Sequence, residues 1–207
     1  MFVDEKLVQR MKEKYPPGSR IVLDYMGDDP RPIEPGTKGT VRMVDDIGTV
    51  HCDFDNGRRL GLVPGEDEFH MEKKPHIQVV LCEPGKKARV TTIKNDLASL
   101  QKLVGGFIEC VYPYEDPVGI ICDEEGKING KELNRALRDE NGNVYDILAG
   151  TFLVVGLGGE DFDSLPKDLC EKYSKMFEYP EMFFRVGNEI EAVRQEVKDT
   201  VRKSKHR

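Results

Sequence analysis

The feature that most constrains the fold is a series of short β-strand patterns, separated by tight turns, in residues 18–72. The dipeptide Asn56-Gly57 lies between two of these patterns, and Asn-Gly is the strongest short-range signal for a β-hairpin. We expect strands at residues 21–26, 39–44, 49–54, 59–63 and 68–72. Short strands at such close spacing predict a small, strongly bent β-barrel.

Residues 75–185 combine strand and helix patterns. We expect strands at residues 77–83, 87–93, 107–112 and 118–123, and a central strand in the apolar run 147–157. We expect helices at residues 97–104 and 163–173, and a short helical turn at 134–137. Asp96 is a suitable N-cap for the first helix, and Gly105 a suitable end. The predicted class is α+β with a mixed or antiparallel sheet.

Both ends of the chain show helical periodicity. Leu7, Val8 and Met11 share one face of a helix at residues 3–14, and a valine-rich stripe predicts a second helix at 189–203. The last 22 residues carry six basic and four acidic side chains. The predicted organisation is an N-terminal helix (1–17), a small barrel (18–74), an α+β domain (75–185) and a basic C-terminal helix (186–207).

Charge and hydropathy limit the partners. The chain has 31 Lys and Arg against 38 Asp and Glu, a formal net charge of −7, which does not favour a large phosphate-neutralising interface. The longest apolar run, 147–157, is shorter than the ~20 residues of a membrane-spanning helix. The first residues have no apolar signal-peptide core. We therefore expect a cytoplasmic protein with no membrane partner.

The sequence lacks the common catalytic and metal-binding motifs. It has no phosphate-binding P-loop, no G-x-S-x-G and no H-E-x-x-H, and its five cysteines include no C-x-x-C pair. The glycines at 156–159 follow an apolar run, but acidic residues come next and would repel a pyrophosphate. We expect no enzyme activity, no metal and no cofactor, and we expect the cysteines to be reduced thiols in the core.

Two segments resemble known families. The runs 35–41, 53–57 and 62–65 make residues 18–72 resemble domain of unknown function 4314, and more generally the SH3-like small barrels. The runs 95–97, 103–109 and 146–152 make residues 77–184 similar to domain of unknown function 3846. Such domains are typical of accessory proteins of phages and conjugative elements. The resemblance therefore implies a mobile-element setting and assigns no reaction.

One candidate ligand site lies in the α+β domain. It comprises Asn134, Arg135, Arg138, Tyr112 and Tyr114. An arginine fork fits carboxylate or phosphate, and an asparagine amide both donates and accepts hydrogen bonds. Together with the tyrosines they would form a pocket for a small anion or base. In the alternative interpretation the arginines pair with nearby carboxylates and hold loops in place.

A candidate partner site lies on the hairpins of the small barrel. It comprises Asp45, Asp46, Asp55, Arg58 and Arg59. The aspartates would weaken contact of the arginines with phosphate, so a protein partner fits better. Our main hypothesis is a non-enzymatic accessory protein that binds a protein partner, with a regulatory or anti-defence role. The alternatives are a binder of a small nucleotide-like ligand, or a nucleic-acid binder that uses Arg58, Arg59 and the basic tail.

Overall fold

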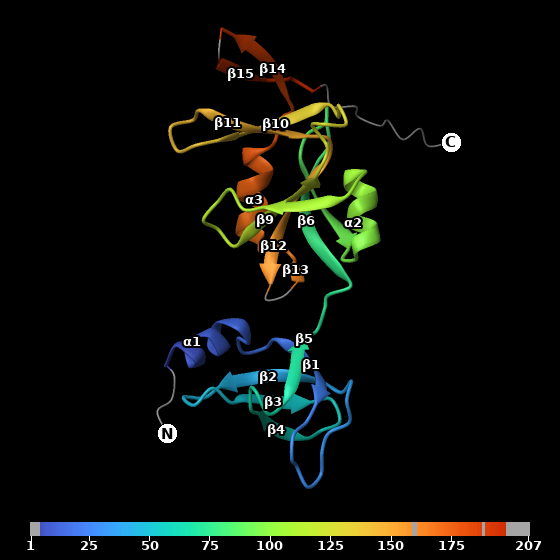
Figure 1. Cartoon of the computed structure of the whole chain (residues 1–207), viewed down its shortest axis with the longest axis vertical. Helices are drawn as coiled ribbons and strands as arrows, with labels where there is room; N and C mark the ends of the chain where they lie inside the picture. Colours follow the sequence, from blue (N-terminus) through green and yellow to red (C-terminus); the bar gives the residue numbers. More distant parts are fainter. Residues whose placement is uncertain (1–4, 159–160, 188, 198–207) are drawn as a thin grey trace, which may run out of the picture. The chain divides into compact units, whose positions relative to one another are not determined.

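A computed structural model describes residues 5–158, 161–187 and 189–197 of the chain (Figure 1). The chain divides into two units, residues 1–73 and 74–207. None of the helices in the described ranges is both long and apolar enough to cross a membrane.

An antiparallel sheet forms the first unit. Its strands are β1 (Arg20–Tyr25), β2 (Lys38–Val44), β3 (Val50–Phe54), β4 (Arg59–Leu62) and β5 (Glu68–Met71), as predicted. The strand order is β4-β3-β2-β1-β5, so the described sheet is open, with β4 and β5 at its edges. The pairing therefore does not show the small, strongly bent barrel that the turn spacing predicts.

The N-terminal helix belongs to the first unit. Helix α1 (Glu5–Lys14) buries Val8, and the chain that follows buries Tyr15 in the core of the sheet. The Tyr15 ring packs against Phe69, with ring centroids 5.0 Å apart. Because these contacts bury aromatic surface, the helix is part of this unit rather than a separate segment of residues 1–17.

A larger antiparallel sheet forms the centre of the second unit. Its strands are β6 (His76–Cys82), β7 (Arg89–Lys94), β8 (Ile108–Val111), β9 (Val118–Asp123), β12 (Phe152–Gly158) and the short β13 (Asp161–Asp163). The order is β7-β6-β12-β9-β8, and β13 pairs with β12. Only the second part of the predicted central strand lies at the centre of the sheet, as β12, whose residues 152–156 are buried because both faces of the sheet are covered.

Different elements cover the two faces of this sheet. Helix α2 (Leu97–Val104) packs on one face through Leu100 and Val104. The Asp96 carboxylate accepts the Ser99 N–H at 2.8 Å, and Gly105 ends α2 at φ 77°, both as predicted. Helix α3 (Lys167–Met176) and the β10–β11 hairpin pack on the opposite face.

The β10–β11 hairpin corrects two sequence predictions. Residues 134–137 form part of strand β10 (Leu133–Arg138) and not a helical turn. The apolar run 147–157 is two strands, β11 (Val144–Ala149) and β12, because Gly150 turns the chain at φ 74°. Strand β10 is extended because β11 pairs with it and because its four central residues are buried.

The C-terminal segment also differs from the prediction. Strands β14 (Glu181–Val186) and β15 (Glu189–Arg194) form a hairpin, and residues 195–197 are not helical, so the predicted helix 189–203 is wrong over residues 189–197. β-Branched residues fit a pleated strand well, and the cross-strand pairs, such as Met182 with Val193, outweigh the local helical periodicity. Residues 198–207 of the predicted helix lie outside the described residues.

Candidate functional site

Asn134 is fully buried at the start of β10. Its side-chain amide donates to the carbonyl oxygens of Cys82 at 3.1 Å and Gly150 at 2.7 Å. These bonds tie β10 to β6 and to the turn before β12. Both amide N–H groups are therefore used within the fold, and neither faces a ligand.

Arg135 is also buried, with 1% of its surface exposed. Its Nε donates to the carbonyl oxygen of Phe177 at 3.1 Å, and one terminal nitrogen donates to that of Lys86 at 2.8 Å. The other terminal nitrogen donates to the backbone and side-chain oxygens of Asn134. Burial holds the pKa of Arg135 below its usual value. This geometry favours the interpretation in which the arginine holds loops in place, although its partners are carbonyls rather than the expected carboxylates.

A cleft of about 1130 Å³ lies beside Arg135 in the second unit. Its walls are residues 113–116, β10 with the following turn, the C-terminal part of α3, and the β14–β15 hairpin. We call it the α3–β10 cleft. Of the five residues of the candidate ligand site, Tyr114, Arg135 and Arg138 line the cleft, whereas Asn134 and Tyr112 do not. The Tyr112 side chain is exposed elsewhere, at the end of edge strand β8.

Tyr114 and Phe177 lie at the floor of the α3–β10 cleft, and the buried Tyr173 packs against both rings. The rings of Tyr114 and Tyr173 lie 5.2 Å apart, and Tyr173 stacks on Phe177 at 6.4 Å. Burial raises the pKa of Tyr114, so its hydroxyl stays protonated at neutral pH. The floor of the cleft is thus aromatic and uncharged at neutral pH.

One ion pair fixes the 113–116 wall to α3. The Asp116 carboxylate accepts bonds from Lys172 Nζ at 2.5 Å and from the Tyr173 hydroxyl at 2.7 Å. Hydrogen bonds from Lys172 and Tyr173 hold the pKa of Asp116 below its usual range. The carboxylate is therefore ionised and already paired within the wall.

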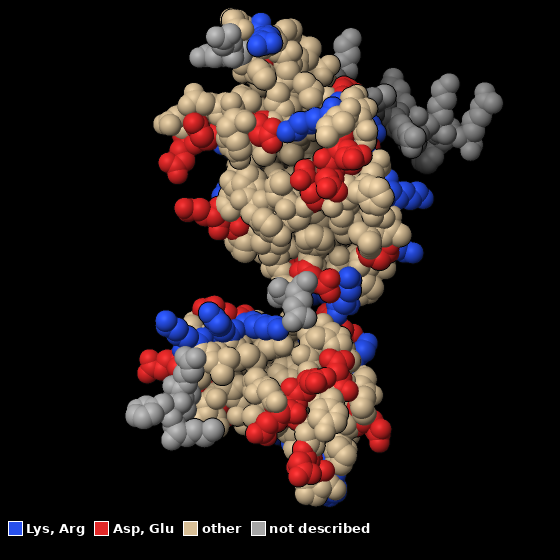
Figure 2. Space-filling model, in the orientation of Figure 1, with Lys and Arg blue, Asp and Glu red and all other residues tan. Residues whose placement is uncertain are grey.

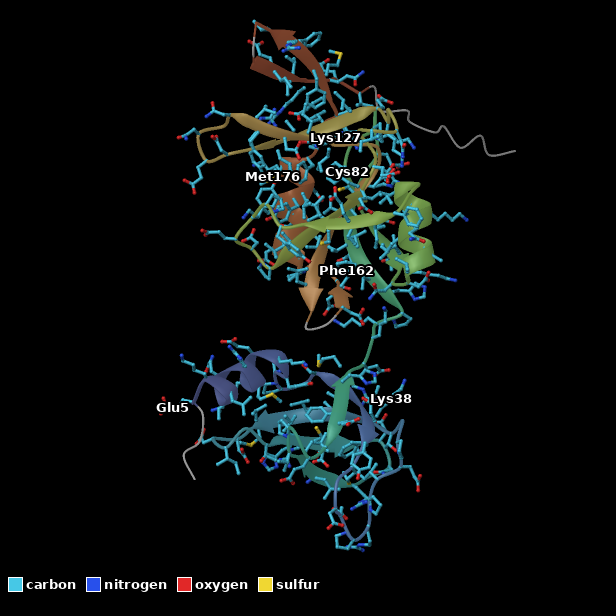
Figure 3. All side chains as sticks on the ribbon, viewed as in Figure 1. Glu5, Lys38, Cys82, Lys127, Phe162 and Met176 are labelled. Atoms are coloured by element: carbon cyan, nitrogen blue, oxygen red, sulfur yellow. The ribbon has the colours of Figure 1, made fainter. Side chains whose placement is uncertain are left out.

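The rim of the cleft presents large side chains to solvent. Tyr145 on β11 is 56% exposed, and Met176 at the end of α3 is 45% exposed. Figure 3 labels Met176 between α3 and the β10–β11 hairpin. Tyrosine and methionine are enriched at protein–protein interfaces relative to the rest of the surface. Sequence reasoning missed both residues, because nothing local distinguishes them from ordinary strand and helix positions.

A carboxylate occupies the β10 side of the cleft. Glu181 accepts the backbone N–H of Ala136 at 2.7 Å and a terminal nitrogen of Arg138 at 2.7 Å. The Glu181 side chain is only 8% exposed. No local pattern predicts this contact, because 45 residues separate Glu181 from Ala136.

The candidate partner residues of the first unit lie in two separate turns. Asp45 and Asp46 lie between β2 and β3, and Asp55 and Arg58 lie between β3 and β4. A five-residue strand, about 17 Å long, separates the two turns. The structure therefore does not bring the predicted residues together as one surface patch.

Within the first unit these side chains have intramolecular contacts. Asp45 lies 2.8 Å from His51 Nε2 and accepts the N–H of Thr49, whereas Asp46 pairs with Lys12 at 2.9 Å. Asp55 forms a bidentate pair with Arg20.

The two adjacent arginines also bond within the unit. Arg58 donates to the backbone carbonyl of Arg31, and Arg59 lies 3.1 Å from Asp53. Figure 2 shows acidic and basic side chains together on the visible face of each unit. The arginines are therefore not arranged as a basic surface of their own.

Among the described residues, no three His, Cys, Asp or Glu side chains group as metal ligands would. The buried cysteines are Cys52, Cys82, Cys122 and Cys170, and Cys110 is partly exposed. Burial raises the pKa of Cys52 to about 11 and that of Cys82 to about 12. These thiols are protonated at neutral pH, which suits core packing.

Comparison with family models confirms both resemblances. Residues 77–178 match the family described as Domain of unknown function (DUF3846), and residues 4–72 match Domain of unknown function (DUF4314). The second match includes α1, in agreement with its packing on the first unit. The β14–β15 hairpin follows the end of the first match. No significant match was found among curated proteins, and none among solved structures.

Proposed function

We propose that this chain, which joins these two family domains, is a non-enzymatic accessory protein that binds a protein partner in the cytoplasm through the α3–β10 cleft. The observation that carries the proposal is the size and lining of the cleft. Its volume is about 1130 Å³, and its lining mixes aromatic, basic and acidic side chains. The exposed rim side chains, Tyr145 and Met176, are of the kind that anchors protein interfaces.

The donors of Asn134 and Arg135 argue for a protein partner over a small nucleotide-like ligand. A small anion would need free, converging donors, but the Asn134 amide and the Arg135 guanidinium already donate to carbonyl oxygens inside the fold. What remains accessible is a broad, mixed surface with an aromatic floor. Such a surface suits a polypeptide segment, which contacts many side chains at once.

The biological setting in the proposal comes from the resemblance. Domains of these two families are typical of accessory proteins of phages and conjugative elements, and a regulatory or anti-defence role fits that setting. We further infer that the first unit is an SH3-like small barrel, on the basis of its strand order and its single buried core. This unit would either have a purely structural role or bind a second partner through its loops.

Site-specific photo-crosslinking tests the proposed site. Tyr145 is replaced by p-benzoylphenylalanine, and the chain is irradiated in a lysate of the organism that carries it. Tyr112 receives the same replacement as the matched control, since it is also an exposed tyrosine but does not line the cleft.

We expect a discrete, protein-sized adduct from position 145 and none from position 112. The same adduct from both positions, or none from position 145, would exclude the cleft as the partner site. An adduct of nucleic acid, lost steeply as the salt concentration rises, would favour nucleic-acid binding instead.

A further inference from the structure

The Glu181 carboxylate occupies a site on β10 that has the chemistry of a carboxylate receptor. The N–H of Ala136 and the guanidinium of Arg138 both donate to it, at 2.7 Å each. A backbone N–H and an arginine together form charge-assisted hydrogen bonds, which are among the strongest in proteins. We call this pair of donors the β10 carboxylate site.

The β14–β15 hairpin, which delivers Glu181, follows the family domain rather than forming part of it. The family match ends at residue 178, and β14 begins at Glu181. The hairpin is paired only with itself, as a two-stranded sheet, and forms no strand ladder with β10 in the described residues. Its attachment through Glu181 is therefore a side-chain contact added to a domain that is already complete.

The hairpin also packs incompletely on the domain. A groove of about 410 Å³, lined by Leu133, Ile147, Phe183 and Ile190 among others, remains between it and the β10–β11 hairpin. On β14, Phe184 and Val186 are about half exposed, at 49% and 54%. Little apolar burial therefore holds the hairpin in place, and the Glu181 contact carries a large share of its attachment.

Glu181 cannot leave the β10 carboxylate site without a replacement. An emptied site would leave the buried Ala136 N–H without an acceptor, and the partly exposed Arg138 guanidinium without its carboxylate. A second carboxylate would restore both bonds, and the exchange would then be nearly neutral. A segment that displaces the hairpin is therefore favoured when it brings a carboxylate of its own.

We propose that Glu181 is an internal substitute for a carboxylate of the partner, and that an acidic segment of the partner protein displaces the β14–β15 hairpin from the α3–β10 cleft. The lining of the cleft carries both signs of charge, so selectivity for an acidic segment comes from the two donors of the β10 carboxylate site. The proposal rests on the function proposed above and adds the chemical class of the partner segment and an autoinhibitory contact.

Chemical rescue tests the β10 carboxylate site. In Glu181→Ala the site is empty, and added acetate serves as the probe. We expect saturation-transfer NMR to detect acetate binding to this variant and not to the unaltered chain. The Ala136 amide should exchange more slowly in acetate than in sodium chloride of equal ionic strength.

Two variants serve as controls. Glu140→Ala removes another carboxylate that lines the cleft but leaves Glu181 in place, so it should not bind acetate. Glu181→Ala combined with Arg138→Ala removes half of the site and should lose the rescue. Equal binding by the Glu140 and Glu181 variants, or none by Glu181→Ala, would overturn the proposal.

Glu181→Gln keeps the side-chain shape and tests the autoinhibitory contact without emptying the site. We expect the amides of residues 182–194 to exchange about tenfold faster than in the unaltered chain. Unchanged exchange would show that Glu181 does not hold the hairpin. If Glu181 does not hold the hairpin, the crosslink at position 145 is still expected, so this proposal and the proposed function can fail independently of each other.

Discussion

The Nε atom of Arg135 donates a hydrogen bond of 3.1 Å to the backbone carbonyl of Phe177, directly after α3. Residues 135 and 177 are 42 positions apart in the sequence, and this bond joins β10 to the C-terminal end of α3. The side chain that the sequence suggested as a ligand-binding group thus fixes one wall of the α3–β10 cleft.

Replacing Arg135 should destabilise the fold. In Arg135→Ala the carbonyl oxygens of Phe177 and Lys86 lose their donors, and a cavity opens beneath the cleft. We expect a loss of about 3 kcal/mol in the free energy of unfolding, measured by urea denaturation. Lys175→Ala is the control, because Lys175 lines the cleft but is exposed, and it should change the value by less than about 0.5 kcal/mol. Equal stability of the two variants would contradict a structural role for Arg135.

Gly156 on β12 should not tolerate a side chain. A Cβ atom there would lie 2.7 Å from the backbone carbonyl oxygen of Ser164, which the β12–β13 pairing holds in place. We expect Gly156→Ala to lower the free energy of unfolding by about 1–3 kcal/mol. Thermal and urea unfolding of this variant would measure the loss, and unchanged stability would show that the β13 segment moves freely away from β12.

The cysteines should differ in reactivity. Burial raises the pKa of Cys52 to about 11 and that of Cys122 to about 12, so few thiolates exist at pH 8. We expect iodoacetamide at pH 8 to label Cys110 first, because it is the partly exposed one. Peptide mapping by mass spectrometry would follow the labelling. Cys52 or Cys122 reacting as fast as Cys110 in the folded chain would contradict the burial seen here.

The first unit should lose stability in acid. A hydrogen bond from Arg20 holds the pKa of Asp55 below its usual value, and bonds from Lys38 and Arg20 do the same for Glu72. A carboxylate whose pKa is lower in the folded than in the unfolded state stabilises the fold at pH values above the unfolded pKa of about 4. This stabilisation is lost as the pH falls through the folded pKa. The urea concentration at the unfolding midpoint should therefore be steady from pH 7 to about pH 5 and should decrease at pH values below about 4.

Asp55→Asn provides the check on this pH dependence. The variant lacks the titrating group, so its stability should fall less steeply below about pH 4 than that of the unaltered chain. Amide exchange within β1 and β3 would report on the first unit alone. The same steep fall in both proteins would assign the acid sensitivity to other carboxylates.

The strands of the first unit could be predicted because their signals are local. Turn residues such as Asn56-Gly57 and alternating apolar positions lie within a few residues of each other, and the structure has strands at all the predicted places. Strand β10 could not be predicted, because the residues of Leu133–Arg138 are neutral or favourable to a helix. The segment is extended because it is buried against elements that are distant in the sequence. The C-terminal hairpin escaped prediction because its apolar residues also fit helical spacing, whereas the pairing of β14 with β15 makes the segment extended.

The candidate site was predictable only in part. Tyr114, Arg135 and Arg138 were recognised by residue type and line the cleft, but their roles depend on distant partners. Glu181 pairs with β10 across 45 residues, and Met176 reaches the rim only because α3 packs on the central sheet. Long-range packing of this kind leaves no spacing in the sequence that a reader could detect.

Native mass spectrometry of the chain purified from its own host tests the central claim, protein binding in the α3–β10 cleft, most directly. We predict a protein-sized added mass that is lost in the double variant Tyr145→Ser with Met176→Ser and kept in Tyr112→Ser. An added mass of only a few hundred daltons, or a protein-sized mass that survives in the double variant, would contradict the claim.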